Sequence, residues 1–224
     1  MQGKVVVITG GFGVLGRAAG QAAREAGAKP VLIDYAPVPE DLHNMIALGG
    51  VDLTNADAAA AAIAAARDVG GRIDALFNIA GGFAWSTVAD SSLELWEKMF
   101  AINTKTALNA SRAALPHLIE TKGAIVNVGA NGAVRAGAGF GAYAASKQGV
   151  HKLTEAMADE LKGEVRVNAV LPSVLDTAQN RKDMPDANFR AWVAPASLAK
   201  VMLFLASDEA RDITGALIPV TGRV

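Results

Sequence analysis

The sequence predicts an α/β domain built on a parallel, doubly wound sheet of about seven strands, with helices on both faces. Short β-branched runs that are uniformly apolar alternate with Ala-rich helical stretches, as in central strands that are covered on both sides. This alternation implies right-handed βαβ units on a parallel sheet. The 224 residues are 51% hydrophobic and 19% charged, and no linker divides them, so we expect a single domain spanning residues 1–224.

The expected elements follow one another in a regular order. Strands are expected at residues 5–8, 31–33, 73–77, 125–128, 165–170 and 216–220. Helices are expected at residues 17–26, 57–67, 93–118, 143–161 and 197–205. The segment 175–192 is polar, contains Pro185 and has no clear period. We expect it to be a mobile flap over the substrate, the alternative being a plain surface loop.

Composition and charge exclude several classes of function. The formal net charge is −1 and Lys and Arg form no run, which argues against binding to nucleic acid. Cysteine is absent, so we expect neither disulfides nor thiolate metal sites, and a reducing, cytoplasmic compartment. The first apolar run is too short for a signal peptide or a membrane span. The spacing of His43, His117 and His151 suggests no metal site.

A glycine-rich segment at residues 9–16 predicts a dinucleotide site. Gly11, Gly13 and Gly16 form G-x-G-x-x-G between the first expected strand and the first helix, the context of a Rossmann-type fold. Glycine lets the backbone approach a pyrophosphate closely, and the N-terminus of the helix presents free N–H groups to it. A glycine-rich turn with only a packing role is the alternative. The cofactor contacts expected in this segment are Gly10, Gly11, Phe12, Gly13, Val14, Leu15 and Gly16.

Asp34, at the end of the second expected strand, predicts which cofactor is bound. An acid about 20 residues after the glycines accepts hydrogen bonds from the adenosine ribose and repels a 2′-phosphate. Tyr35 follows, and no Arg or Lys stands next to it to neutralise a phosphate. We therefore expect NAD(H) to be favoured over NADP(H), with a capping or loop aspartate as the alternative.

Tyr143 and Lys147 are the expected proton donor and its helper. They are four residues apart in an expected helix and therefore share one face. A free tyrosine has a pKa of about 10, and a nearby ammonium stabilises the phenolate. Such a tyrosine can protonate a developing oxyanion or amide-like nitrogen as hydride arrives. An ordinary exposed helix pair is the alternative.

With these motifs in order, the chain resembles the short-chain dehydrogenase/reductase superfamily over essentially its full length. Residues 78–81, Asn-Ile-Ala-Gly, are similar to the N-N-A-G signature of that superfamily. The resemblance implies that Asp52 lies beside the adenine ring and that Asn103 holds a water linking Lys147 to solvent. The further cofactor contacts that it implies are Asp52, Leu53, Asn78, Ala80, Gly81, Tyr143, Lys147, Pro172, Val174 and Thr177.

Two departures from the superfamily pattern point to one of its branches. The middle glycine of T-G-x-x-x-G-x-G has moved to position 13, with Val14 in its usual place. Ala130 stands where the catalytic serine is expected. Both departures, together with segments 80–85 and 170–185, resemble quinoid dihydropteridine reductase. The C-terminal stretch is similar to generic short-chain reductases, so the resemblance to this branch is partial.

Three functions are left open, of which we favour the first. It is NADH-dependent reduction of a small, flat conjugated ring of the quinonoid dihydropterin kind, which is polarised enough to react without the serine. The second is a short-chain alcohol dehydrogenase or carbonyl reductase in which Asn131 replaces the missing donor. The third is a catalytically weak NAD(H)-binding sensor, against which intact Tyr143, Lys147 and Asn103 count. The expected substrate contacts are Phe83, Trp85, Ala130, Asn131 and Trp192.

The resemblance also implies a homodimer or homotetramer. In the superfamily, the helices that correspond to residues 93–118 and 143–161 pair across a dimer interface. A purely intramolecular role for both helices is the alternative.

Overall fold

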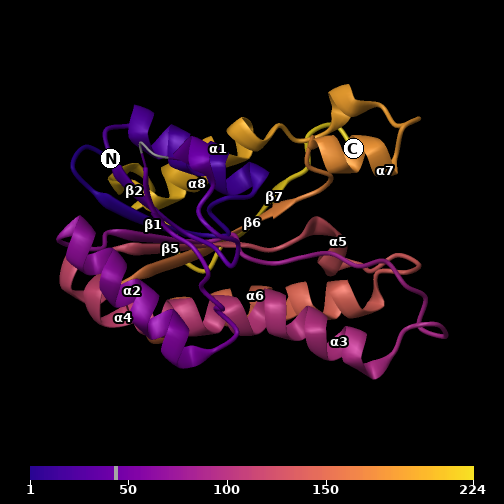
Figure 1. Cartoon of the computed structure of the whole chain (residues 1–224), viewed down its shortest axis with the longest axis horizontal. Helices are drawn as coiled ribbons and strands as arrows, with labels where there is room; N and C mark the ends of the chain where they lie inside the picture. Colours follow the sequence, from indigo (N-terminus) through magenta and orange to yellow (C-terminus); the bar gives the residue numbers. More distant parts are fainter. Residues whose placement is uncertain (43–44) are drawn as a thin grey trace.

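Seven parallel strands form one sheet in the order β3-β2-β1-β4-β5-β6-β7, as Figure 1 shows for most of them. The structure is a computed structural model that describes residues 1–42 and 45–224. The predicted fold class, a Rossmann-type parallel sheet with helices on both faces, is confirmed. The strands are β1 (Val5–Thr9), β2 (Lys29–Ile33), β3 (Ile46–Leu48), β4 (Ala75–Asn78), β5 (Ala124–Val128), β6 (Arg166–Pro172) and β7 (Leu217–Val220).

Helices cover both faces of this sheet. In Figure 1, α1 and α8 lie on one side of it and α2, α4 and α6 on the other. No helix in the described part of the chain has the length and apolar character needed to cross a bilayer. The helices are α1 (Val14–Glu25), α2 (Ala56–Gly70), α3 (Leu93–Phe100), α4 (Thr106–Thr121), α5 (Asn131–Val134), α6 (Gly141–Glu160), α7 (Ala178–Asp183) and α8 (Pro195–Ala206).

The central strands are mainly apolar because both of their faces are buried. In β1, Val6 and Ile8 belong to the core under α1 and α8, whereas Val5 and Val7 belong to the core under α2 and α4. Alternate side chains of a strand point to opposite faces, so a sheet between two helical layers favours apolar residues on both faces of its strands. The ends of the central strands, which border the site, are therefore held in place by a close-packed core.

The single helix expected at residues 93–118 is interrupted, which corrects that prediction. A π-helical turn, η2 (Ala101–Lys105), separates α3 from α4. Wide turns of this kind inside a helix are rare and often occur at functional sites. The turn contains Asn103, one of the expected catalytic residues, and the sequence pattern gave no sign of it.

The segment expected as a flap or plain loop contains regular structure. It includes α7 and a 3-10 turn, η3 (Phe189–Ala191), and Leu175 forms a parallel bridge with Val193 at its base. Arg181 pairs with Asp176 in two hydrogen bonds of 2.6 and 2.8 Å. These contacts join the two ends of the segment to each other and hold α7 to its start.

Candidate active site

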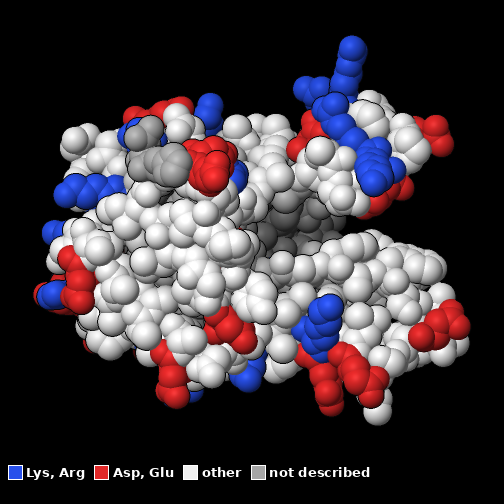
Figure 2. All heavy atoms as spheres, in the orientation of Figure 1, with Lys and Arg blue, Asp and Glu red and all other residues white. Residues whose placement is uncertain are grey.

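A cavity of about 970 Å³ opens at the carboxyl ends of the strands. It lies where the strand order reverses between β1 and β4, the usual place of ligands in open α/β sheets. Figure 2 shows a hollow, bordered in this view mainly by uncharged atoms, below the part of the chain that carries α7. The predicted residues that line the cavity are Gly10, Gly13, Val14, Leu15, Gly16, Asp34, Tyr35, Asp52, Leu53, Ala80, Gly81 and Thr177.

Other residues of the cavity wall were not predicted, although most are chain neighbours of predicted ones. They are Val51, Thr54, Ile79, Ile102, Thr106, Leu175, Ala178 and Gln179. Conversely, five expected cofactor contacts outside the Tyr143 and Lys147 pair are not in this wall: Gly11, Phe12, Asn78, Pro172 and Val174.

The glycines of the first loop differ in what they do. Gly10 has a φ of +64°, and a Cβ on it would stand 2.8 Å from the backbone nitrogen of Ala80. A Cβ on Gly16 would collide with the carbonyl oxygen of Gly10. A Cβ on Gly13 would meet only Gly10 O, at 3.5 Å. Gly10 and Gly16 are thus required by packing, whereas Gly13 keeps the cavity side of the loop open.

The N-terminus of α1 faces this loop without a side-chain cap. Its N-cap is Gly13, and its first turn carries no acidic residue. The first N–H groups of a helix have no partner within the helix, and the helix dipole adds partial positive charge there. The site therefore fits the pyrophosphate of a dinucleotide.

Asp34 is held at the edge of the same cavity by backbone groups. Its Oδ2 accepts a hydrogen bond from Phe12 N at 2.9 Å, and its Oδ1 accepts one from Ala36 N at 3.0 Å. Each carboxylate oxygen keeps capacity for a further donor, such as a ribose hydroxyl. No Lys or Arg is among the described residues that line the cavity, so nothing in its wall is placed to neutralise a 2′-phosphate.

Asp52 and Leu53 form a second part of the wall. Thr54 donates to Asp52 Oδ1 from its hydroxyl and from its backbone nitrogen, and these bonds lower the pKa of Asp52. Asn109 Nδ2 donates to Leu53 O at 2.9 Å. The turn after β3 is therefore rigidly placed beside the glycine loop.

Asn78 braces the sheet instead of lining the cavity. It is buried, and its Nδ2 donates to Ser111 Oγ at 2.9 Å and to Asn127 Oδ1 at 2.8 Å. Nearby, Thr9 Oγ1 accepts from the backbone nitrogens of residues 79 and 80. The amide nitrogen of Asn78 is thus bound inside the protein, whereas its Oδ1 is buried without a hydrogen-bond partner among the described residues. A contact of Asn78 with the cofactor stays a prediction.

Tyr143 and Lys147 lie one turn apart on α6, and both are largely buried. Lys147 is 6% exposed, and its Nζ donates to Val128 O at 2.8 Å. Burial lowers the pKa of Lys147 to about 8 and raises the pKa of Tyr143 to about 12. Desolvation alone raises the pKa of Tyr143, and stabilisation of its phenolate by Lys147 stays a prediction.

Asn103 connects the π-helical turn to this pair. Its Nδ2 donates to Gly82 O and to Ser146 Oγ, each at 3.0 Å, and its Oδ1 accepts from Gly82 N at 3.1 Å. A Cβ on Gly81 would collide with Asn103 Oδ1 and stand 3.3 Å from Lys147 Nζ. Because Gly81 also lines the cavity, Lys147 lies just behind the inner wall of the cavity. The water on Asn103 remains a prediction.

Phe83, not Trp85, is the aromatic neighbour of the expected proton donor. The Phe83 and Tyr143 rings meet edge to face, with centroids 4.9 Å apart, and Phe140 lies 5.3 Å from Phe83. Trp85 packs over Gly139, and its Nε1 donates to Ala138 O at 3.1 Å. Phe140 was not predicted, since nothing in the sequence shows that its loop folds back onto position 83.

The remaining expected substrate contacts lie in two places. Ala130 is buried in a small cluster against which Tyr143 packs, and Asn131 is exposed at the start of α5. Trp192 instead contacts Phe189, with ring centroids 4.8 Å apart. The structure thus brings Ala130 and Phe83 to Tyr143 and gives Trp192 a packing contact within its own segment.

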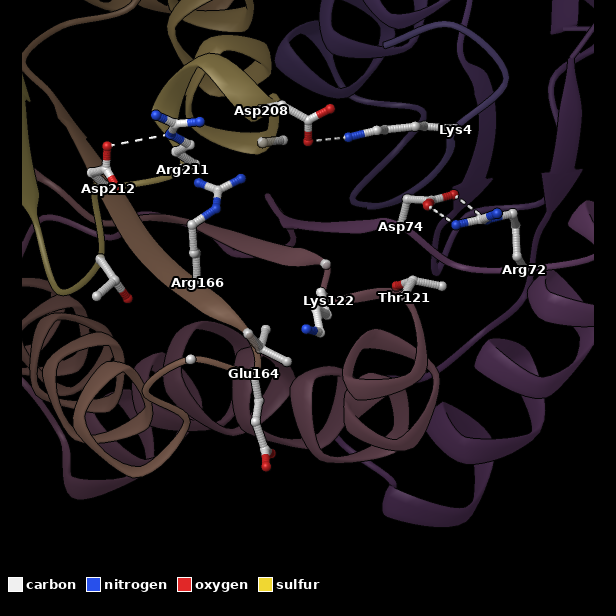
Figure 3. Close-up of a pocket in the computed structure, with 15 residues that line it drawn as sticks. Lys4, Arg72, Asp74, Thr121, Lys122, Glu164, Arg166, Asp208, Arg211 and Asp212 are labelled. Carbon is white, nitrogen blue, oxygen red and sulfur yellow. Dashed lines mark hydrogen bonds and ion pairs between the residues drawn. The ribbon is translucent and has the colours of Figure 1, made fainter.

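A second cavity, of about 420 Å³, lies at the amino ends of the strands (Figure 3). Lys4 pairs with Asp208 at 2.6 Å, and Arg72 donates to Asp74 at 2.9 and 2.6 Å. Arg166 donates to three backbone carbonyl oxygens, those of residues 205, 207 and 210. Several of the charged side chains that line this cavity are therefore bound to other groups of the protein.

Three or more His, Asp or Glu side chains do not gather into a possible metal site anywhere in residues 1–42 and 45–224. Of the three histidines considered, His43 lies outside the described residues. His151 is buried on α6, and His117 lies on α4.

Residues 4–188 match the model of the short chain dehydrogenase family. The meso-2,3-butanediol dehydrogenase of Serratia marcescens is 34% identical over 98% of this chain and 93% of its own length. The carveol dehydrogenase of Mycobacterium avium, solved in complex with NAD, is 27% identical with a TM-score of 0.87, covering 99% of this chain and 97% of that one. The 3-ketoacyl-(acyl-carrier-protein) reductase of Brucella melitensis, solved with NADH, is 27% identical with a TM-score of 0.86 and covers 99% and 98%.

Proposed function

The chain belongs to the short chain dehydrogenase family, and from this we propose that it is an NAD(H)-dependent oxidoreductase interconverting a small alcohol and its carbonyl compound. One observation carries the proposal. Gly81 lines the cavity that fits a dinucleotide, and a Cβ added to it would stand 3.3 Å from Lys147 Nζ. Lys147 lies one turn from Tyr143 on α6. Cofactor and proton donor would therefore meet at the inner end of one cavity.

We propose NAD(H) as the preferred cofactor because the part of the cavity that would hold the adenosine is negatively charged. Asp34 presents a carboxylate there, and the described wall of the cavity carries no Lys or Arg. A 2′-phosphate would be repelled, whereas two ribose hydroxyls could both donate to the carboxylate. The names of two solved relatives, which were determined with NAD and NADH, agree with this preference.

The protonation states of Tyr143 and Lys147 suggest their roles in the reaction. When bound, NADH supplies the hydride, which is added to the carbonyl carbon. Tyr143, whose pKa burial raises to about 12, holds a proton at neutral pH and gives it to the carbonyl oxygen. Lys147 is buried beside it as a cation that stabilises the resulting phenolate until solvent restores the proton.

Ala130 decides between two substrate classes. Losing a hydrogen-bond donor to an oxyanion costs about 3–4 kcal/mol of transition-state stabilisation. A carbonyl substrate therefore needs another donor, and Asn131 is adjacent, exposed and without a side-chain hydrogen bond among the described residues. A quinonoid ring, the substrate of the branch expected from the sequence, is the second candidate, since it is already polarised and needs less stabilisation by a hydrogen-bond donor. The relatives named above are other dehydrogenases and reductases, which favours the carbonyl class.

The test compares the two classes on the same protein. NADH oxidation is measured with a panel of small ketones and diketones and with a quinonoid dihydropterin, and NAD reduction with the corresponding diols. We expect turnover of ketones or diols that rises in Ala130→Ser and falls in Asn131→Ala. Turnover restricted to the quinonoid acceptor would favour the second candidate. Tight NADH binding with no turnover on any compound would instead support the sensor function.

We also propose that the chain forms a homodimer or homotetramer. Members of the family are commonly oligomeric, and α3 exposes the large apolar side chains of Leu93 and Phe100. Light scattering at micromolar concentration checks the assembly. A mass of 23.0 kDa in solution, that of one chain, would contradict it.

A further inference from the structure

His151 contacts the backbone directly behind the residue that replaces the serine. It lies on α6 one turn beyond Lys147 and is 1% exposed. Its Nε2 accepts a hydrogen bond from Ala130 N at 3.2 Å. An imidazole nitrogen accepts only when it carries no proton, so this contact requires a neutral ring with its hydrogen on Nδ1.

The residue before Ala130 leaves room for this ring. A Cβ on Gly129 would collide with His151 Nε2 and would stand 3.4 Å from Leu171 Cδ1. Gly129 N still donates to Val170 O at 2.9 Å, so the sheet continues to this point. The Gly-Ala pair after β5 and the histidine on α6 therefore fit each other in shape.

Lys147 and His151 hydrogen-bond two backbone groups, one at the end of β5 and one just after it. Lys147 Nζ donates to Val128 O, whereas His151 accepts from Ala130 N. The two bonds have opposite polarity: Lys147 donates, whereas His151 accepts and can do so only with an unprotonated Nε2. Protonation of His151 would turn its acceptor into a donor facing an N–H and place a second buried cation near Lys147.

The charges around the ring favour the neutral state. Burial and then the charge of Lys147 lower the pKa of His151. Lys152 acts in the same direction and Glu155 in the opposite one, and both are on α6 like His151 itself. The neighbours from β5, β6 and the turn after β5, which are Gly129, Ala130 and Leu171, carry no charge.

We propose that His151 is a positioning residue, which acts by holding the Ala130 N–H and so fixes how residues 130 and 131 face Tyr143. Ala130 belongs to the cluster on which Tyr143 packs, so a shift of this backbone changes the wall of the substrate site. The kinetic part of the inference rests on the proposed function. The structural part, a neutral acceptor at His151, does not.

Two variants separate the hydrogen bond from the packing of the ring. His151→Gln can place an oxygen near the position of Nε2 and keep an acceptor, whereas His151→Leu keeps bulk and removes it. With the substrate found for the wild type, we expect His151→Leu to lower kcat roughly 10- to 100-fold, since small displacements have effects of this size. KM for NADH should stay close to wild type in both variants, and kcat of His151→Gln should stay close to that of the wild type.

The pH profile adds a readout that a purely packing role would not change. In the wild type, kcat should fall as the pH drops through the pKa of His151, and this acid limb should be missing in His151→Gln. Equal loss of kcat in both variants, or an acid limb unchanged in His151→Gln, would overturn the inference. So would a wild-type kcat in His151→Leu.

Nitrogen NMR of the ring tests the structural part even if no substrate turns over. The signals of His151, assigned by their loss in His151→Gln, should show an unprotonated Nε2 and a protonated Nδ1 at neutral pH. A cationic ring or the opposite tautomer would contradict the proposed contact whatever the kinetics show. A correct tautomer together with an inactive wild type would refute the proposed function and leave this contact intact.

Discussion

At the carboxyl ends of the strands, the cavity wall consists of glycines, apolar and neutral polar side chains and the carboxylates of Asp34 and Asp52, with no Lys or Arg among its described residues. At the amino ends, Lys4 is bound to Asp208, Arg166 is bound to carbonyl groups beyond α8, and Arg72 is bound to Asp74 in its own loop. The first end keeps hydrogen-bonding capacity for a ligand, and the second uses its capacity to join parts of the fold. The two cavities therefore differ in whether their polar groups are already bound within the protein. Variants at the carboxyl ends should change cofactor binding and turnover, whereas variants at the amino ends should change stability.

The largest expected effect is the loss of turnover in Tyr143→Phe. General acid catalysis contributes about 10²- to 10⁴-fold, so kcat should fall by roughly this factor while NADH affinity changes little. Stopped-flow measurement of NADH oxidation and fluorescence titration with NADH check the two parts. Arg166→Met, at the other end of the sheet, is the matched control and should retain wild-type kcat. A Tyr143→Phe enzyme with normal kcat would contradict the catalytic role given to the carboxyl ends of the strands.

The second prediction concerns stability at high pH. The pKa of Lys147 is about 8 in the folded protein and about 10.4 in an unfolded chain, so the unfolded state binds more protons between these values. Stability should therefore rise with pH from about 8 to about 10, by up to roughly 3 kcal/mol. Denaturant unfolding at several pH values should show this rise in the wild type and not in Lys147→Met. A rise of the same size in Lys147→Met would show that another group is responsible.

The third prediction concerns the contribution of the amino-end cavity to stability. Arg166→Met removes a half-buried guanidinium that donates to three carbonyl oxygens between α8 and the turn after it. Hydrogen bonds of charged groups contribute about 1.5–3 kcal/mol, and we expect a loss of unfolding free energy of this order. Urea unfolding measures it, with KM for NADH as the parallel readout. A raised KM with unchanged stability would assign this end a binding role.

The smallest expected effect is a change of cofactor preference in Asp34→Ser. Removal of the carboxylate takes away an acceptor for ribose hydroxyls and the repulsion of a 2′-phosphate. We expect NADH to bind roughly tenfold more weakly and NADPH more tightly than in the wild type. Fluorescence titration with both cofactors checks this, and Asp208→Ser at the amino end should leave both affinities unchanged. Equal affinities for NADPH in wild type and Asp34→Ser would contradict the role of the carboxylate.

Much of the fold could be predicted because β1, β4 and β5 are buried on both faces and are apolar at all but one position each. β3 was missed because it is a three-residue edge strand that is only partly buried. The π-helical turn at Asn103 was missed because its residues fit an ordinary helical pattern. Local periodicity predicts which face is buried, but not where an extra residue enters a turn.

For the candidate site, the chain order predicted the glycine loop and Asp34, since both follow strand ends. The states of Tyr143 and Lys147 could not be predicted, because they depend on burial and on a bond to Val128 O. The contact of Phe83 with Tyr143 depends in the same way on how distant loops meet. Spacing along a helix shows which residues share a face, but their protonation depends on what surrounds that face.

Hydrogen exchange with and without NADH tests the central claim most directly, because it reports on both ends of the sheet in one experiment. We expect slower exchange at residues 9–16, 34–36 and 79–82 when NADH is added. We expect no change at residues 121–123 and 163–166, which line the amino-end cavity together with more distant residues. Protection confined to the amino-end segments, or no protection at saturating NADH, would contradict the account.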